Sequence, residues 1–449
     1  MSASDPTRFP VLTRLADGTV KQRNPFTGTE VWTVPGRADR PLGQESVPAA
    51  PLDRSLAGRY CAFCERRYLD TPPEKARLVR SIGGTGERWQ QLDGLLAEEL
   101  DETVAEFRRI PNLFEILPLD YWRANYGYQP ADALRAQQHR YVSTPAGRRH
   151  VLSIVRRRLA AAGLAEAEWP HLSEDNLLQR AEAFFASGHE VIVARRHFVD
   201  DAGWDDQLAY SGSLTAEEHF RYVGFTAQAM RALYEANPYV RYVAVFQNWL
   251  RQAGASFDHL HKQLAGIDEY GGQTLQELEQ LRSRPDLFNA AAVNEAIAQD
   301  LLLAENDHAV AFAGFGHRYP TLEVYSKSAA CLPWLHSEDE LRAMSELLHA
   351  CHAATGATVP TNEEWHHQPP RVVEPMPWRV MVKWRVSTIA GFEGGTKIYL
   401  NTIDPWSLRD RVLPRFFELR EQGMLARSRI GPECTAHPDS LRYQQHSAR

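Results

Sequence analysis

No stretch of the 449-residue sequence approaches the roughly 18 consecutive apolar residues that a membrane-spanning helix requires. The first residues also lack the basic start and apolar core of a secretory signal. Cysteine is scarce, and its five residues, an odd number, fit a reducing compartment better than a disulfide framework. We therefore expect a cytoplasmic protein with no membrane partner.

An excess of positive charge is also missing. The chain has 50 Lys and Arg against 57 Asp and Glu, a formal net charge of -7, whereas nucleic-acid binders usually have a basic balance. No nucleic-acid partner is expected. The G-x-x-x-x-G-K-[ST] loop, a strand-to-helix G-x-S-x-G turn and the H-E-x-x-H helix are absent as well, which argues against P-loop, α/β-hydrolase and zincin chemistry.

The sequence does contain two strand-helix-strand patterns, each with a capping box at the start of its helix. The β-rich runs are 189–194 and 239–246 in the first pattern, and 321–326 and 379–387 in the second. The helices are expected at 216–236, capped by Thr215 with Glu218, and from Ser337 with Glu340 as far as Gly356. We expect an α+β fold with an internal duplication, in which antiparallel sheets are flanked by helices.

Residues 113–185, which come before the first of these patterns, have a different pattern. Apolar residues recur there at helical spacing, for example at Val151, Ile154, Val155 and Leu159. The pattern predicts an inserted helical subdomain.

Polar side chains alternate in the segment Asp258-His-Leu-His-Lys-Gln263. If this segment is a strand, His259, His261 and Gln263 line one face because side chains two positions apart point the same way. An exposed edge strand with incidental histidines would show the same pattern, so the flanking sequence has to decide.

Residues 246–263, FQNWLRQAGASFDHLHKQ, resemble the active-site segment of the galactose-1-phosphate uridylyltransferase family, a branch of the histidine-triad superfamily. The pattern is F-x-N, a G-A-S stretch and H-x-H-x-Q. The resemblance extends to residues 24–41, 61–64, 109–114, 189–193 and 391–405, in the right order. It implies two histidine-triad-like halves: a catalytic half with the zinc site from 1–112 and 186–265, and a substrate-binding half from 266–449. The helical insertion, 113–185, lies outside the resemblance.

In the resembling family the second histidine of the motif attacks the α-phosphorus and carries the nucleotide covalently. This role falls on His261, with a backbone carbonyl of Leu260 or His259 expected to hold its other ring nitrogen. Gln263 would hydrogen-bond a phosphoryl oxygen. Histidine-triad hydrolases have a histidine where this chain has Gln263, so the resemblance favours transfer over hydrolysis.

The resemblance also implies one structural zinc held by two cysteines and two histidines. The ligands would be Cys61, Cys64, His259 and, as the preferred fourth, His197, with His189 as the competitor. Two buried thiols without metal are the alternative for the cysteine pair. No second metal is expected, because the second-half strand of the family that carries histidines reads Pro377-Trp-Arg-Val-Met-Val-Lys383 here and only His366 remains nearby.

The remaining candidate residues match family positions that contact the nucleotide or the sugar. They are Arg37, Arg40, Asn112, Asn248, Ser256, Glu393 and Tyr399. Tyr399 stands where the galactose enzyme has glutamine, which makes this segment more similar to the ADP-glucose phosphorylase branch.

We therefore expect an enzyme that moves a nucleoside monophosphate between a nucleoside diphosphate sugar and a sugar 1-phosphate by a ping-pong route, as a possible homodimer. A phosphorylase acting with inorganic phosphate on ADP-glucose or a dinucleoside polyphosphate is the nearest alternative. A non-catalytic nucleotide-binding relative and a zinc hydrolase are the others.

Overall fold

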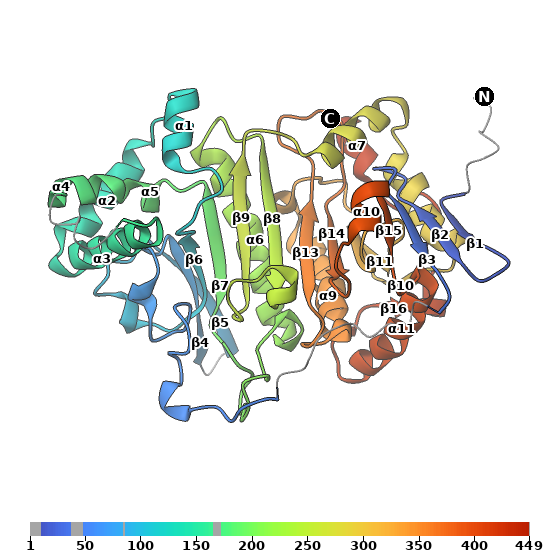
Figure 1. Cartoon of the computed structure of the whole chain (residues 1–449), viewed down its shortest axis with the longest axis horizontal. Helices are drawn as coiled ribbons and strands as arrows, with labels where there is room; N and C mark the ends of the chain where they lie inside the picture. Colours follow the sequence, from blue (N-terminus) through green and yellow to red (C-terminus); the bar gives the residue numbers. More distant parts are fainter. Residues whose placement is uncertain (1–9, 37–47, 84–85, 165–171, 449) are drawn as a thin grey trace.

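The computed structural model describes residues 10–36, 48–83, 86–164 and 172–448. Its centre is one sheet of twelve described strands, and all neighbouring strands in it are antiparallel (Figure 1). The spatial order is β16-β10-β11-β12-β14-β13-β8-β9-β7-β6-β4-β5. The α+β class expected from the sequence is confirmed.

The strands of this sheet are β4 Ala76–Gly83, β5 Gly86–Asp93, β6 Ala105–Pro111, β7 His189–Ala194, β8 Tyr242–Trp249, β9 His261–Ile267, β10 Leu302–Glu305, β11 Ala309–Ala313, β12 Thr321–Ser326, β13 Thr361–His366, β14 Arg379–Trp384 and β16 Arg429–Ile430. A second, four-stranded sheet consists of β1 Leu12–Arg14, β2 Val20–Arg23, β3 Glu30–Thr33 and β15 Ile398–Leu400.

The two long helices predicted from capping boxes are present. Helix α6, Ala216–Ala236, contacts β7, β8 and β9, and helix α9, Glu338–Thr355, contacts β11, β12 and β14. In each helix the side chain of the capping residue accepts a hydrogen bond from the backbone N–H of the Glu three positions later. The carboxylate of that Glu accepts a hydrogen bond from the backbone N–H of the capping residue. Both helices bury their apolar side, and they also contact each other.

The halves of the sheet have the same local order. Strands run β8-β9-β7-β6 outward from the centre on one side and β13-β14-β12-β11 on the other. Helix α6 connects β7 to β8 in the chain, as α9 connects β12 to β13. The edge strands β8 and β13 pair with each other from Thr361↔Trp249 to Trp365↔Val245, so the sheets expected for separate halves form one ladder.

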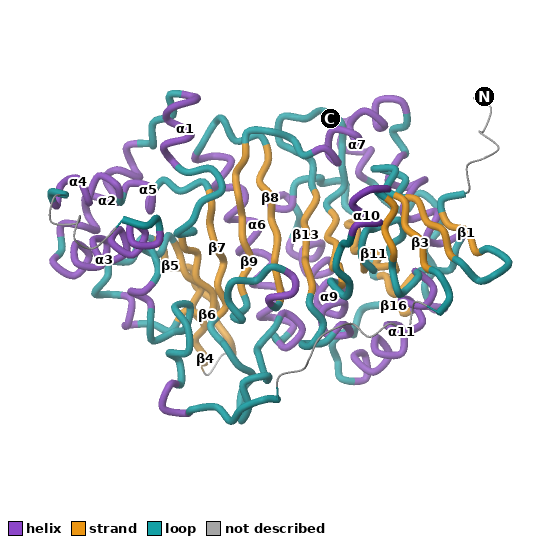
Figure 2. The backbone as a smooth tube through the Cα atoms, viewed as in Figure 1, coloured by secondary structure: helices purple, strands orange, loops and turns teal. Residues whose placement is uncertain are grey.

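The helices described between residues 113 and 185 gather at one end of the molecule (Figure 2). They are α1 Leu119–Tyr126, α2 Asp132–Ser143, α3 Pro145–Ala161, α4 Glu174–Arg180 and α5 Glu182–Phe185. Val151, Ile154 and Val155 on α3 are buried in a small core with Phe184 and Phe185, as their spacing predicts.

The other helices are α7 Gly272–Ser283, α8 Asn294–Ala298, α10 Gly391–Thr396 and α11 Pro405–Glu421. Helix α11 contacts α9, β10 and β11. No helix in the described ranges is long and apolar enough to cross a membrane.

Candidate active site

Strand β9 separates two sets of side chains. Lys262 and Leu264 point to the α6 side of the sheet, where the Lys262 ammonium lies 4.7 Å from the centre of the Tyr222 ring. The alternation of a strand therefore puts His261 and Gln263 on the opposite face. This is the arrangement expected from the H-x-H-x-Q spacing.

The imidazole of His261 is held by the backbone beside it. Its Nδ1 lies 2.7 Å from the carbonyl oxygen of His259, so a neutral ring keeps its proton on Nδ1 and its lone pair on Nε2. Burial lowers the pKa of His261 to about 4, which favours that neutral form. The ring of Phe63 packs against it at 5.2 Å between centroids. A neutral imidazole with an available Nε2 is the nucleophilic form.

The side chain of Gln263 has its orientation fixed by two neighbours. The backbone N–H of Ile116 donates to Nδ1 of His189, so the proton of a neutral His189 is on Nε2, which donates to Gln263 Oε1 over 3.1 Å. The backbone N–H of Phe114 donates to Oδ1 of Asn112, and the Asn112 amide therefore donates to the same Oε1, also over 3.1 Å. Both bonds turn the Gln263 NH₂ group away from His189 and Asn112.

Four metal-ligating side chains meet next to β9. Cys61, Cys64, His197 and His259 place their ligand atoms within 4.8 Å of one another. The distances are 3.8 Å between the two sulfurs, 3.4 Å from Cys61 Sγ and 4.0 Å from Cys64 Sγ to His259 Nδ1, 3.5 Å from Cys64 Sγ to His197 Nδ1, and 3.3 Å between the two Nδ1 atoms. His189 is in the Gln263 network instead.

These distances fit zinc. A tetrahedral ion with bonds of about 2.3 Å to sulfur and about 2.0 Å to nitrogen separates its sulfurs by about 3.8 Å and its nitrogens by about 3.3 Å. The far ring nitrogen of His259, Nε2, donates to the carbonyl oxygen of Ala194 over 2.7 Å, which fixes the ring with Nδ1 toward the cluster. His259 thus contributes its ring to the cluster and its carbonyl to His261.

The other predicted residues are distributed more widely. Asn248 is on β8, where Asn362 of β13 donates to its Oδ1 over 2.7 Å. Ser256 is exposed in the loop before β9. Glu393 is in α10 and accepts a hydrogen bond from the backbone N–H of Ala390, which caps that helix. Tyr399 is in β15, which pairs with β3 in the small sheet. Arg37 and Arg40 lie outside the described residues.

The surroundings of His366 argue against a second cation. Arg379 stands directly opposite it on β14, and after burial the guanidinium is the main cause that lowers the pKa of His366. Arg379 is itself fully buried and paired with Glu277 of α7. A guanidinium beside the only remaining histidine of the family pattern disfavours a bound cation.

Sequence reasoning missed two sets of residues. The role of His189 toward Gln263 depends on the pairing of β7 with β9, in which Val191 stands opposite Gln263. The pair of Lys262 and Glu363 is fully buried on the α6 side, with Nζ 2.5 Å and 2.6 Å from the carboxylate oxygens. A Lys in the motif strand was a signal, because a buried ammonium needs a carboxylate partner.

Comparisons with known proteins show relatives of similar sequence and fold. ADP-glucose phosphorylase of Arabidopsis thaliana is 25% identical over 175 residues, 37% of this chain, and the chain spans half the length of that relative. A crystal structure of an ADP-glucose phosphorylase from Arabidopsis thaliana with bound ADP-glucose is similar with a TM-score of 0.54 and 17% identity, over 88% of this chain and 98% of the other. The structure of a GalT-like protein from Arabidopsis thaliana is similar with a TM-score of 0.53 and 16% identity, over the same shares.

The resemblance inferred from the motifs is thereby confirmed, and the structural similarities show a shared fold. A family model described as "Domain of unknown function (DUF4921)" matches residues 15–443, nearly the whole chain. On that match, the protein belongs to the DUF4921 family.

Proposed function

We propose that the protein is a nucleotidyltransferase that carries a nucleoside monophosphate on His261, between a nucleoside diphosphate sugar and a sugar 1-phosphate. The observation that carries the proposal is the 2.7 Å contact between His261 Nδ1 and the carbonyl oxygen of His259. This contact leaves Nε2 unprotonated and fixes the orientation of the ring on the face of the sheet that also carries Gln263.

In the first step Nε2 of His261 attacks the α-phosphorus, a P–N bond forms, and the P–O bond to the departing sugar 1-phosphate breaks. The Nδ1 proton stays in its bond to the His259 carbonyl and supports the positive charge on the ring. In the second step a phosphate oxygen of the acceptor attacks the same phosphorus and the P–N bond breaks. Two displacements at one phosphorus allow the same groups to serve both substrates.

The NH₂ group of Gln263 is suited to a phosphoryl oxygen, because His189 and Asn112 occupy its carbonyl side. An amide can donate a hydrogen bond but cannot transfer a proton to a leaving group at neutral pH. This difference favours transfer to a phosphorylated acceptor over reaction with water.

The four-ligand cluster supports a structural role for zinc. Cys61, Cys64, His197 and His259 fill a tetrahedral shell, so the bound ion would supply rigidity and no open coordination position. The His259 backbone, fixed from the ring side, then holds the nucleophile.

We also infer that the two halves, 1–112 with 186–265 and 266–449, are copies of one unit. The repeated order of strands and connecting helices supports this. Only the first half carries the H-x-H-x-Q strand.

A phosphorylase is the second candidate, supported by the sequence match to ADP-glucose phosphorylase. In that reaction inorganic phosphate replaces the sugar 1-phosphate as acceptor. Release of a nucleoside diphosphate that depends on phosphate and needs no sugar phosphate would favour it.

The test is intact-mass measurement after incubation with ADP-glucose or UDP-glucose. A nucleotidyl adduct that is acid-labile, stable to base and absent from His261→Ala is expected, and its mass identifies the base. His139→Ala, at an exposed position of α2, is the matched control. Normal turnover by His261→Ala would refute the proposal.

A further inference from the structure

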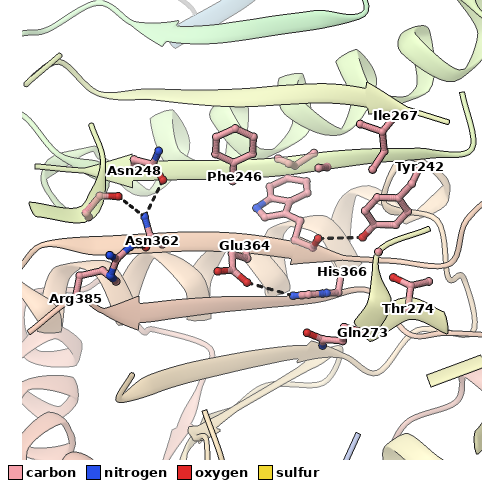
Figure 3. Close-up of a pocket in the computed structure, with 15 residues that line it drawn as sticks. Tyr242, Phe246, Asn248, Ile267, Gln273, Thr274, Asn362, Glu364, His366 and Arg385 are labelled. Carbon is pink, nitrogen blue, oxygen red and sulfur yellow. Dashed lines mark hydrogen bonds and ion pairs between the residues drawn. The ribbon is translucent and has the colours of Figure 1, made fainter. Parts of the chain in front are cut away.

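A cavity of 580 Å³ lies at the seam where the two halves of the sheet meet (Figure 3). Its floor is formed by β8 and β13, and the start of α7 contributes Gln273 and Thr274. Figure 3 shows Asn248, Asn362 and Arg385 at one end, and Tyr242, His366 and Thr274 at the other. We call it the seam pocket. Its volume is in the range of small-molecule sites, about 300–1,000 Å³.

Sheet register connects the seam pocket to His261. Phe246 stands opposite Gln263, the last paired position of β8 and β9, and Asn248 and His261 each lie two residues beyond that pair in the same direction. Asn248 is in turn opposite Asn362. Directly opposed residues of antiparallel strands share a face, and strands are about 4.8 Å apart. The polar end of the seam pocket therefore begins one strand away from His261, on the same face.

Charge is distributed unevenly along the pocket. The guanidinium of Arg385 donates to Asn362 Oδ1 over 2.6 Å and lies 4.6 Å from the Tyr319 ring, and its buried Nε has no hydrogen-bond partner among the described residues. No carboxylate of the described ranges pairs with it. The end of the pocket nearest to His261 is therefore positive.

The middle of the pocket contains a negatively charged group. Glu364 is opposite Phe246, and its carboxylate is 2.5 Å from the Lys383 ammonium. Burial alone would raise the pKa of Glu364, but Lys383 and His366 lower it, so the group is an ionised acceptor. A carboxylate here disfavours a phosphate and accepts hydrogen bonds from hydroxyl groups. Phe246 offers an apolar surface next to it.

From this arrangement we propose that the seam pocket binds the sugar 1-phosphate part of the substrate. The phosphate lies against Arg385 and the Asn248 amide, and the sugar hydroxyls lie toward Glu364, Gln273 and Thr274. Asn362 donates both of its amide hydrogens to Asn248 Oδ1 and the Ala253 carbonyl oxygen, so its role is to hold Arg385 in place. The inference rests on the proposed function and extends it to the substrate: the same group is the leaving group of the first displacement and the acceptor or product of the second. His189 is on β7 and Asn112 follows β6, on the far side of β9 from the pocket, which leaves that side for the nucleoside.

The experiment measures binding of glucose 1-phosphate, galactose 1-phosphate, inorganic phosphate, AMP and UMP to the zinc-loaded full chain by calorimetry. Arg385→Gln should weaken both sugar phosphates and inorganic phosphate about tenfold or more, the cost of one charged hydrogen bond. Glu364→Gln should weaken the sugar phosphates and leave inorganic phosphate unchanged. AMP and UMP should bind both variants as they bind the parent protein.

A cavity-filling variant, Ala244→Leu, tests the same point without removing a charge and should exclude sugar phosphates while inorganic phosphate still binds. Arg231→Gln and Glu235→Gln, an exposed ion pair on α6, are matched controls, and thermal melting checks the fold of each variant.

Sugar-phosphate affinity that is absent in the parent protein, or unchanged in Arg385→Gln and Ala244→Leu, overturns the inference. Loss of AMP or UMP binding instead would assign the pocket to the nucleoside and also overturn it. The His261 adduct is read separately: an adduct without pocket dependence leaves the proposed function intact, and pocket-dependent sugar-phosphate binding without an adduct refutes the function alone.

Discussion

The Nε2–H of His189 in β7 donates to the side-chain oxygen of Gln263 in β9, over 3.1 Å. Because a backbone N–H occupies the other nitrogen of His189, the direction of this bond is determined, and with it the rotation of the Gln263 amide. His189 is thus a positioning residue for a group two positions from the proposed nucleophile.

Replacing His189 should slow formation of the nucleotidyl adduct without loss of zinc. His189→Ala removes one of the two donors that orient Gln263, so we expect about a tenfold lower single-turnover rate, less than the 10²–10³ typical of losing a transition-state donor outright. Rescue by His189→Gln, which can donate to the same oxygen, would separate positioning from folding. An unchanged rate in His189→Ala would remove this role.

Gln263→His should change the outcome of the reaction. An imidazole at this position can transfer a proton, so the adduct should react faster with water and the ratio of hydrolysis to transfer should rise. Product analysis with labelled ADP-glucose or UDP-glucose measures the ratio. The double variant with His261→Ala is the control, and if it hydrolyses equally fast the product does not arise from the adduct.

Zinc content distinguishes His197 from His189 as the fourth ligand of the cluster. We expect about one zinc per chain in the native protein, and loss of it in Cys61→Ser, Cys64→Ser and His197→Ala, with retention in His189→Ala. Metal analysis after dialysis against a chelator measures this, and Cys434→Ser, a cysteine outside the cluster, is the control. Because four protein ligands would close the shell of a bound zinc, its removal should lower the melting temperature together with activity.

The buried pair of Lys262 and Glu363 should matter for stability. Burial raises the pKa of Glu363, but Lys262 and His352 more than offset this and lower it to about 2, so the carboxylate is ionised in the folded protein. Lys262→Met leaves that charge without its ammonium, and we expect the free energy of unfolding to fall by about 3–5 kcal/mol. Urea denaturation of this variant and of the exposed-site control Lys397→Met measures the difference. A loss of unfolding free energy equal to that of the control would show that the ion pair makes no net contribution to stability.

Local signals made part of this structure predictable. The capping boxes located α6 and α9 because a cap is formed by residues three positions apart. Period-two alternation placed His261 and Gln263 on one face, because it also depends only on residues that are close in the sequence. The continuous sheet was not predictable in this way, since the pairing of β8 with β13 joins residues more than 100 positions apart.

Glu393 and Tyr399 stay predicted substrate residues, and their place in the molecule could not be read from a motif. Both were assigned to the substrate from a family pattern, which gives the order of segments but no distances. The structure puts them in α10 and β15, the latter paired with β3 in the small sheet. Apart from Phe246 and Asn248 of the F-x-N pattern, the residues that line the seam pocket lie outside the motifs, because the register of β8 with β13 and the start of α7 bring them together.

The ladder through β8 and β13 also limits how the protein could select its substrates. Opening or closing the halves about a hinge would break main-chain hydrogen bonds from Thr361↔Trp249 to Trp365↔Val245, and each such bond is costly to leave unmade. A rigid floor therefore runs under both the nucleophile and the seam. On the proposed function, discrimination between one sugar and another would arise from side chains and loops above that floor, which would make specificity open to change by single substitutions.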